Sequence, residues 1–433
     1  MKIFRETNVY EASIERIDYI FKTFPRIYLS FSGGKDSGVM LNLCIDYMRK
    51  HNITNKLGVM VMDNEANYTQ SLDFMHRILK KNLDILDVYW VCLPLTLPCS
   101  VSSYDITYIT WGVDDEHRWI RERPKESYVV SIENYKEKGL DFYELNMHDK
   151  DFYDNFSLWY SKSELCANLI GIRTSESLNR FRAIINPRKE KIDGHIWTRK
   201  NLGNCFNCYP IYDWRTEDIW GANCLNDWDY NTLYDIFWKS GMTVHQMRVA
   251  SPFMSESKSS LNLYRVIDPH VWVRLCGRVQ GANFLATYGK QLNYHSFKLP
   301  KNHTWKSFVK FLLDTLPDES SLNFKQRFIQ SIKYWWRIGR GLSPEIISEL
   351  EKHNIPFVKG NNTRHGRKDK ICIRMLPQDH LDMLRCHNSE VTSWKRYALT
   401  ILKNDHTCKY LGLAPTQEQL KRQKQIQEKY KSL

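Results

Sequence analysis

The stretch YLSFSGGKDSGVMLNL, from Tyr28 to Leu43, restricts the fold of this chain more than any other segment. It places two glycines, a lysine, an aspartate and a serine between two apolar runs. The pattern predicts a buried strand over residues 26–31, a tight turn, and a helix over residues 37–50. Backbone N–H groups of such a turn, with the positive end of the helix behind them, form a binding site for an anion such as phosphate.

Strands and helices continue to alternate after this segment. KLGVMVMD predicts a second strand that ends at Asp63, and helical residues 68–81 follow it. ILDVYWVCLPL and CANLIGIR predict a third and a fourth strand. Alternation of this kind is typical of an α/β fold with a doubly wound, mostly parallel sheet, in which ligands bind beyond the carboxyl ends of the strands. We therefore expect three segments that follow strands to meet at one edge: residues 30–37, 63–65 and 171–180.

The pattern of apolar residues divides the chain into three parts. Residues 1–220 form the expected nucleotide-binding domain, with a polar and aromatic insertion at about 100–160. Residues 221–294 are predicted to be a helical continuation of that domain. Residues 295–433 are expected to be a C-terminal module of unknown function, and its polar tail, residues 417–433, is typical of a solvated helix.

Charge and cysteine content limit the classes of protein. The net charge of +13 and the pI near 9.1 favour acidic partners such as nucleotides, although solubility alone explains such a charge equally well. No window approaches the roughly 18 apolar residues that a membrane span needs. The N-terminus has no apolar signal core, so we expect a cytoplasmic protein whose eleven cysteines are reduced thiols or metal ligands.

The loop differs from a Walker P-loop, because Lys35 is followed by Asp36 instead of serine or threonine. Ser32 and Ser37 can donate hydroxyl groups to a phosphate, and Lys35 can neutralise its charge. Asp36 is expected to cap the helix, or to hold a divalent metal together with the phosphates, because a carboxylate does not face a phosphate directly.

The six residues SGGKDS resemble the PP-loop of the superfamily of ATP pyrophosphatases and phosphoadenosine-phosphosulfate (PAPS) reductases, whose fold is also called adenine nucleotide alpha hydrolase-like. GIRTSESLNR, residues 171–180, resembles the second signature of PAPS-reductase-like proteins. YPIYDWRTEDIW, residues 209–220, resembles the segment that closes the nucleotide site in that family. VHQMRVASPF and SWKRYALTILKND are similar to a subgroup with an added C-terminal domain of unknown function, the immunoglobulin-binding regulators, which are often paired with a ParB-like protein.

The resemblance implies roles for particular residues. Lys35, Asp36 and Arg173 would be catalytic, and Glu176 and Arg180 would bind the second substrate. An ordinary salt-bridge ladder on a helix is the alternative for the segment from Arg173 to Arg180. Asp63 and Glu65 are candidates for metal or ribose contact, with helix capping equally plausible. The implied nucleotide-binding residues are Ser30, Phe31, Ser32, Gly33, Gly34, Lys35, Asp36, Ser37, Asp63, Gly171 and Arg173.

The resemblance also implies an enzyme of sulfur metabolism or adenylyl transfer. Lys35 favours an intact ATP, with Mg²⁺ bridging its phosphates, and cleavage between the α and β phosphates. A sulfonucleotide (PAPS) reductase is one alternative, but the Glu-Cys-Gly-Leu-His segment of thioredoxin-dependent reductases is absent. A non-catalytic nucleotide sensor that regulates a ParB-like partner is the other.

Three further segments have two interpretations each. Cys205 and Cys208 are candidates for a thiol pair or for half of an iron–sulfur or zinc site, although free cysteines are usually buried apolar residues. Residues 108–124 predict either a lid or substrate-selecting insertion, or a charged surface helix. The basic residues 361–370 suit nucleic-acid phosphates, whereas a solvated loop is the simpler interpretation.

Overall fold

The computed structural model describes residues 6–185, 189–254, 257, 260–288, 297–360, 370–384 and 390–413. The basic segment 361–369 and the polar tail 417–433 lie outside the described residues. The chain divides into two compact units, each considered by itself. The first unit contains Met1–Leu97, Tyr108–Pro252 and Ser260–Arg278, and the second contains Pro98–Thr107, Phe253–Ser259 and Val279–Leu433. The domain boundaries at 220 and 294 stay a prediction.

A seven-stranded sheet with the order β6-β3-β2-β1-β7-β9-β8 forms the centre of the first unit. Its strands are β1 (Arg26–Ser30), β2 (Leu57–Met62), β3 (Leu86–Cys92), β6 (Val129–Ser131), β7 (Cys166–Ile170), β8 (Thr198–Lys200) and β9 (Cys205–Cys208). Every neighbouring pair is parallel except β8–β9, which is antiparallel. The expected mostly parallel α/β sheet is therefore confirmed.

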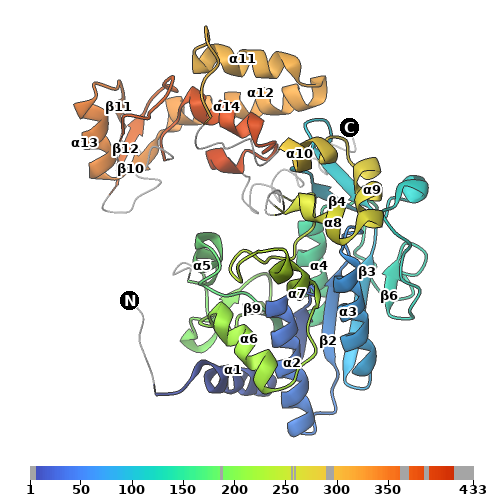
Figure 1. Cartoon of the computed structure of the whole chain (residues 1–433). Coiled ribbons are helices and arrows are strands. Elements are labelled where there is room, and N and C mark those ends of the chain that lie inside the picture. Colours follow the sequence, from blue (N-terminus) through green and yellow to red (C-terminus); the bar gives the residue numbers. More distant parts are fainter. Residues whose placement is uncertain are drawn as a thin grey trace, which may run out of the picture. The chain divides into compact units, whose positions relative to one another are not determined.

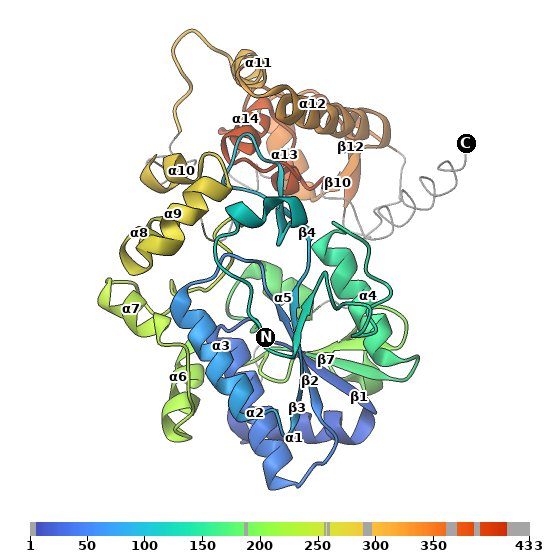
Figure 2. The same cartoon turned by 90° about the vertical axis from the view of Figure 1, so that its right-hand side faces the viewer.

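Helices cover both faces of this sheet. Figure 2 shows α2 and α3 on one face and α4 on the other. The helices of the first unit are α1 (Val9–Thr23), α2 (Lys35–Lys50), α3 (Thr69–Lys81), α4 (Asp149–Ser161), α5 (Leu178–Ile184), α6 (Thr216–Leu225), α7 (Leu233–Lys239), α8 (Tyr264–Ile267) and α9 (Pro269–Arg278). Because both faces are covered, β2 reads as a continuous apolar run, and five of its six residues are buried.

The order of connections places a topological switch point beside β1, which Figure 2 labels together with β2 and β7. Figure 1 labels α2 and β2, the two elements that follow β1. The chain passes from β1 through α2 to β2, and later enters β7 on the other side of β1. Ser30, the last residue of β1, is in register with Ile170, the last residue of β7. The loops that follow β1 and β7 therefore leave the sheet at the same level, where α/β proteins bind ligands.

Residues 100–160, whose periodicity is mixed, contain short elements and one longer helix. β4 (Leu95–Pro98) and β5 (Thr107–Thr110) form a two-stranded sheet. A 3₁₀ helix, η1 (Val113–Arg118), follows β5, and α4 precedes β7.

The second unit combines helices with a small antiparallel sheet of order β10-β12-β11. Its elements are α10 (Ala282–Tyr288), α11 (Trp305–Thr315), α12 (Asp318–Lys333), β10 (Arg340–Leu342), α13 (Pro344–Lys352), β11 (Val358–Lys359), β12 (Ile371–Arg374) and α14 (Trp394–Leu402). The expected helical C-terminal extension is thus confirmed, and the three strands are an addition. Within the described ranges, no helix is both long and apolar enough to cross a membrane.

Candidate functional site

The loop between β1 and α2 adopts a conformation that only glycine accommodates. Gly33 has φ +68°, and a Cβ atom there would lie 2.8 Å from Cγ of Met75. Gly34 is the N-cap of α2, which begins at Lys35. Gly33 therefore lets the chain turn closely against Met75 before α2 begins, whereas Gly34 has an extended backbone and room for a Cβ atom.

Hydrogen-bond donors are concentrated at this turn. Asp36 and Ser37 occupy the first turn of α2, and among the described residues nothing accepts their backbone N–H groups. The Ser37 hydroxyl lies 3.0 Å from the Ser32 hydroxyl and accepts the Ser32 N–H at 3.3 Å. The Ser37 hydroxyl itself donates to the Gly34 carbonyl at 3.1 Å. The free N–H groups and the positive end of a long helix, beside the exposed Ser32 hydroxyl, therefore form a cradle for an anion.

A buried ion-pair network lies behind the cradle. The Arg173 Nε donates to the Asp36 carboxylate, which also lies 3.3 Å from the Lys35 Nζ. The same arginine donates to the Ser175 hydroxyl at 3.1 Å and the Thr216 hydroxyl at 3.3 Å. Asp36 therefore binds two cations, and Arg173 connects the loop to the start of α6.

The segment after β7 touches the loop directly. A Cβ atom on Gly171 would lie 2.7 Å from the Asp36 carbonyl oxygen and 2.8 Å from the Ser37 Cα. Backbone atoms at these distances leave no room for a side chain. The structure thus brings residues 30–37 together with Gly171 and Arg173.

Glu176 and Arg180 lie at the rim of this site. The Arg180 Nη1 lies 2.9 Å from the Glu176 carboxylate, one turn earlier, and its side chain is partly exposed. The Glu176 carboxylate also accepts the Arg173 N–H at 3.1 Å, and its carbonyl accepts the Arg248 Nη2 at 2.6 Å. The ladder interpretation therefore describes one of these contacts, the i,i+4 pair. Cations outnumber carboxylates around the cradle, which favours an anionic ligand.

Comparison with known proteins assigns this site to a family. Residues 26–240 match the phosphoadenosine phosphosulfate reductase domain, and residues 241–422 match a domain of unknown function, DUF3440. The chain carries a PAPS reductase domain followed by DUF3440. The PAPS reductase domain includes the loop, Gly171, Arg173 and the segment over residues 209–220, so the family resemblance of these motifs is confirmed.

Two uncharacterized proteins are similar to this chain in sequence. The uncharacterized protein YbdN of Escherichia coli (strain K12) is 29% identical over 416 residues, covering 94% of this chain and 91% of YbdN. The uncharacterized protein MJ0973 of Methanocaldococcus jannaschii is 25% identical over 214 residues, covering 48% of this chain and 38% of MJ0973. A solved PAPS reductase from Candida auris, in a phosphate complex, has 18% identity and a TM-score of 0.28, covering 52% of this chain and 84% of its own.

Asp63 directly follows β2 in the PAPS reductase domain, and protein groups donate hydrogen bonds to both of its carboxylate oxygens. Its carboxylate accepts the Trp90 Nε1 at 2.7 Å and the Glu65 N–H at 2.9 Å, and it forms an ion pair with Arg121. Its backbone carbonyl accepts the Trp111 Nε1 at 2.8 Å. A role for Asp63 in nucleotide binding stays a prediction, and the contacts described here are structural ones.

Glu65 fastens the insertion to the same end of β2. It accepts the Trp111 N–H at 3.0 Å and the Ile120 N–H at 2.9 Å, and the Arg278 Nε lies 3.1 Å away. Both Glu65 and Arg278 are buried. Two buried carboxylates, each with an arginine partner, thus hold residues 108–121 in one position.

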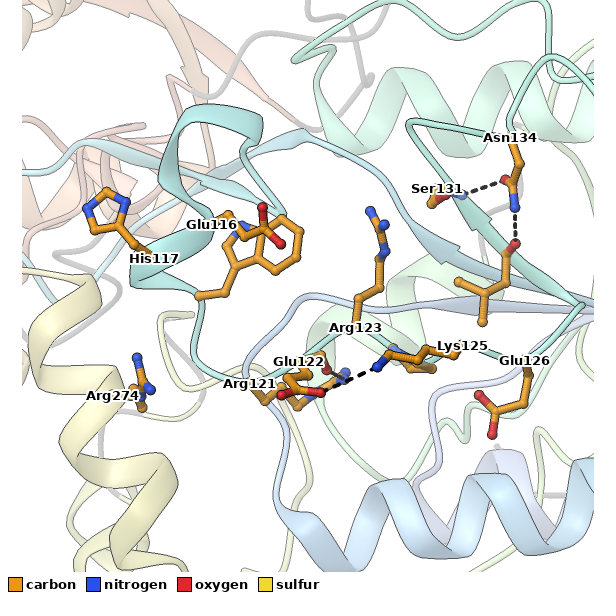
Figure 3. Close-up of a pocket in the computed structure, with 13 residues that line it drawn as sticks. Glu116, His117, Arg121, Glu122, Arg123, Lys125, Glu126, Ser131, Asn134 and Arg274 are labelled. Carbon is orange, nitrogen blue, oxygen red and sulfur yellow. Dashed lines mark hydrogen bonds and ion pairs between the residues drawn. The ribbon is translucent and has the colours of Figure 1, made fainter.

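A pocket of about 630 Å³ lies against this insertion (Figure 3). In the close-up, His117 and Arg274 lie on one side of the space and Ser131 and Asn134 on the other. Its lining mixes charges, because it contains both carboxylates and cations: Glu116, Glu122, Glu126, Arg121, Arg123, Lys125 and Arg274. Part of the insertion, from Glu116 to Pro124, thus lines the pocket, while the 3₁₀ helix Val113–Arg118 has no buried residue. Both interpretations of residues 108–124 stay predictions.

The two cysteines of CFNC occupy β9, and a strand alternates its faces. Cys205 donates to the Ser157 carbonyl of α4 at 3.2 Å, whereas Cys208 belongs to the apolar core of the opposite face. Cys205 is in register with Cys166, and a hydrogen bond from that thiol lowers the pKa of Cys205. Cys205 and Cys208 therefore do not fit one shared metal ion, and no cluster of three metal ligands occurs in the described part of the chain.

Three residues that contact the loop were not predicted from the sequence. The Asn231 Nδ2 donates to the Gly33 carbonyl at 2.9 Å, the Tyr234 hydroxyl accepts the Lys35 N–H at 3.0 Å, and the Met247 carbonyl accepts the Lys35 Nζ at 3.3 Å. They come from the segment around α7, about two hundred residues after the loop. Its sequence, DYNTLYDIFWKSG, predicts an aromatic helix and carries no local signal of a phosphate contact.

Proposed function

We propose that the PAPS reductase domain binds ATP at residues 32–37 and cleaves it between the α and β phosphates, transferring the adenylyl group to an acidic substrate. The observation that supports this most is the cradle of free backbone N–H groups at the start of α2, beside a buried lysine, at the switch point of the sheet. A loop of this kind binds a polyphosphate without any covalent chemistry by the protein.

The reaction needs positioning and charge stabilisation more than a nucleophile from the protein. An oxygen of the acidic substrate attacks the α-phosphorus, the bond from that phosphorus to the α–β bridging oxygen breaks, and pyrophosphate leaves with the bond's electron pair. Lys35 and the N–H groups would stabilise the charge that develops on pyrophosphate. Asp36 and Arg173 would act by holding Lys35 and the loop in place.

Mg²⁺ fits this proposal as a companion of the nucleotide. The carboxylate nearest the loop, Asp36, binds Arg173 and Lys35, so it is a poor ligand in this arrangement. Glu176 pairs with Arg180. Mg²⁺ typically keeps several waters and binds substrate phosphates with few protein ligands, and here the phosphates would supply most of its coordination.

The two alternatives predict different observations. The reductase alternative takes its thiol from Cys205 or Cys208, and both are buried. A nucleotide sensor, with a ParB-like protein as its partner, would bind ATP without turning it over. Nucleic acid, which the basic charge also favours, would be a partner only under that alternative.

The products formed from ATP and Mg²⁺ test the proposal. Pyrophosphate with AMP or an adenylylated acceptor is the expected outcome, and orthophosphate with ADP would show that a different bond is cut. Sulfite formed from PAPS and a reduced thiol carrier would support the reductase, and binding without any product would support the sensor.

Lys35→Ala should reduce pyrophosphate release by tenfold to about 1,000-fold, since charge-stabilising donors at a reacting group have effects of that order. Lys50→Ala is the matched control, because Lys50 is the last residue of the same helix and is exposed. Equal rates for wild type and Lys35→Ala would contradict the role given to Lys35.

A further inference from the structure

Tyr234, on α7, places a hydroxyl at the N-terminus of α2. Its oxygen accepts the Lys35 N–H at 3.0 Å and would lie 3.5 Å from a Cβ atom on Gly34. The Lys35 Nζ lies over the face of the Tyr234 ring, 5.4 Å from the ring centroid. The hydroxyl of a residue outside the loop thus lies beside the backbone N–H groups at the start of α2.

The proton of this hydroxyl has no acceptor among the described residues. A tyrosine hydroxyl accepts and also donates, but among the residues that the structure describes none receives a hydrogen bond from Tyr234. Tyr234 is only 3% exposed, and its hydroxyl lies at the start of α2, where the loop presents its backbone N–H groups. Burial also raises the pKa of Tyr234 above its usual value, so the proton stays on the oxygen. A buried donor without an acceptor is rare in folded proteins and calls for a partner.

The tyrosine is held rigidly in this position. Asn231, which is fully buried, donates to the Gly33 carbonyl and to the Ser71 hydroxyl, both at 2.9 Å, and accepts the Leu233 N–H at 3.0 Å. These bonds fasten the start of α7 to the loop itself. Tyr234 is therefore positioned together with the loop, as a fixed part of the cradle.

We propose that Tyr234 donates its hydroxyl hydrogen to a phosphate oxygen of the bound nucleotide and so extends the cradle beyond residues 32–37. The hydrogen bond from the Lys35 N–H orients the phenol. It also polarises the hydroxyl, which strengthens the hydrogen bond that the hydroxyl donates to the phosphate. The inference rests on the proposed binding of ATP at this loop, and it assigns a phosphate contact to a residue outside the loop motif.

Calorimetry with three probes, ATP with Mg²⁺, inorganic pyrophosphate and adenosine, tests this role. Tyr234→Phe should weaken binding of ATP and pyrophosphate about tenfold or more, as expected for a lost hydrogen bond to a charged group. Binding of adenosine should stay unchanged, which a general loss of structure would not produce. Tyr230→Phe is the matched control, because the Tyr230 hydroxyl donates to Asp235 on the same segment and not to the loop.

The other results each have one meaning. Unchanged affinity for ATP and pyrophosphate in Tyr234→Phe would overturn the inference while leaving the proposed function intact. Tighter binding would also overturn it, since the hydroxyl would then be a competitor for the Lys35 N–H. Wild-type protein that binds neither ATP nor pyrophosphate would remove both proposals. If Tyr234→Phe does not fold, 3-fluorotyrosine in place of Tyr234 keeps the shape and is a stronger donor, so tighter binding of pyrophosphate is expected and unchanged or weaker binding contradicts the contact.

Discussion

Gly171 shows how a single residue determines whether the site forms. Its α-carbon faces the backbone of Asp36 and Ser37, with no side chain between the end of β7 and the start of α2. This approach lets Arg173, two residues later, reach Asp36. A glycine with this neighbour in space cannot be told from an ordinary loop glycine by sequence alone, because Asp36 lies 135 positions earlier.

Gly171→Ala should destabilise the fold by about 1–3 kcal/mol, because overpacking against backbone is not relieved by side-chain rotation. It should also weaken ATP binding, since the start of α2 must shift. Gly221→Ala is the control: Gly221 lies within α6, and nothing lies within 4 Å of its added Cβ. Urea unfolding and calorimetry measure the two effects. A loss of stability no larger than that of the control would show that β7 can move away from α2 without cost.

At the scale of elements, the two-residue period of a strand decides where the two cysteines of CFNC point. In a loop or at a helix start, a C-x-x-C pair can converge on one metal ion. In β9 the same spacing sends one thiol toward α4 and the other into the core on the opposite face. The sequence could show the spacing, whereas pairing with β7 and β8 decided that the segment is a strand.

Cys205→Ser and Cys208→Ser should each bind ATP with an affinity within about twofold of wild type, because neither thiol contacts the loop or forms an ion site. Elemental analysis of the purified protein should show no zinc or iron in stoichiometric amount bound through these residues. Cys224→Ser, at an exposed position, is the control for substitution of a thiol. Stoichiometric metal that disappears in either buried variant would contradict this assignment.

The end of β2 is a second case at this scale. Asp63 follows a strand in the family order, so the sequence placed it among the nucleotide contacts. Its partners Trp90 and Arg121 come from β3 and the insertion and contact one carboxylate oxygen, while the Glu65 N–H donates to the other. Insertions carry no periodic signal, and their contacts with a strand end were therefore beyond prediction.

At the scale of the whole molecule, the division into two compact units predicts where ligand binding will be felt. The loop, Gly171, Arg173 and Tyr234 all belong to the first unit. A ligand stabilises the native state that binds it. The exchange rates of individual amide hydrogens show which segments are stabilised.

ATP should therefore slow amide hydrogen exchange in peptides covering residues 30–37, 171–180 and 231–239. Peptides of the second unit, such as those from α11 and α12, should exchange at unchanged rates. The Lys35→Ala variant with the same ATP concentration is the control and should show less slowing. Equal slowing in the second unit would contradict a response confined to the first.

The sequence by itself determined the strand, turn and helix around SGGKDS, the mostly parallel sheet and the family, because these depend on local periodicity and on residues close together in the chain. Tertiary structure alone decided which partners each side chain meets: Arg173 for Asp36, Trp90 and Arg121 for Asp63, opposite faces of the sheet for Cys205 and Cys208, and the Lys35 N–H for the hydroxyl of Tyr234. Contacts between residues far apart in sequence depend on how the elements pack. Side-chain chemistry is local, but the partners that satisfy a buried charge or hydroxyl are supplied by the fold.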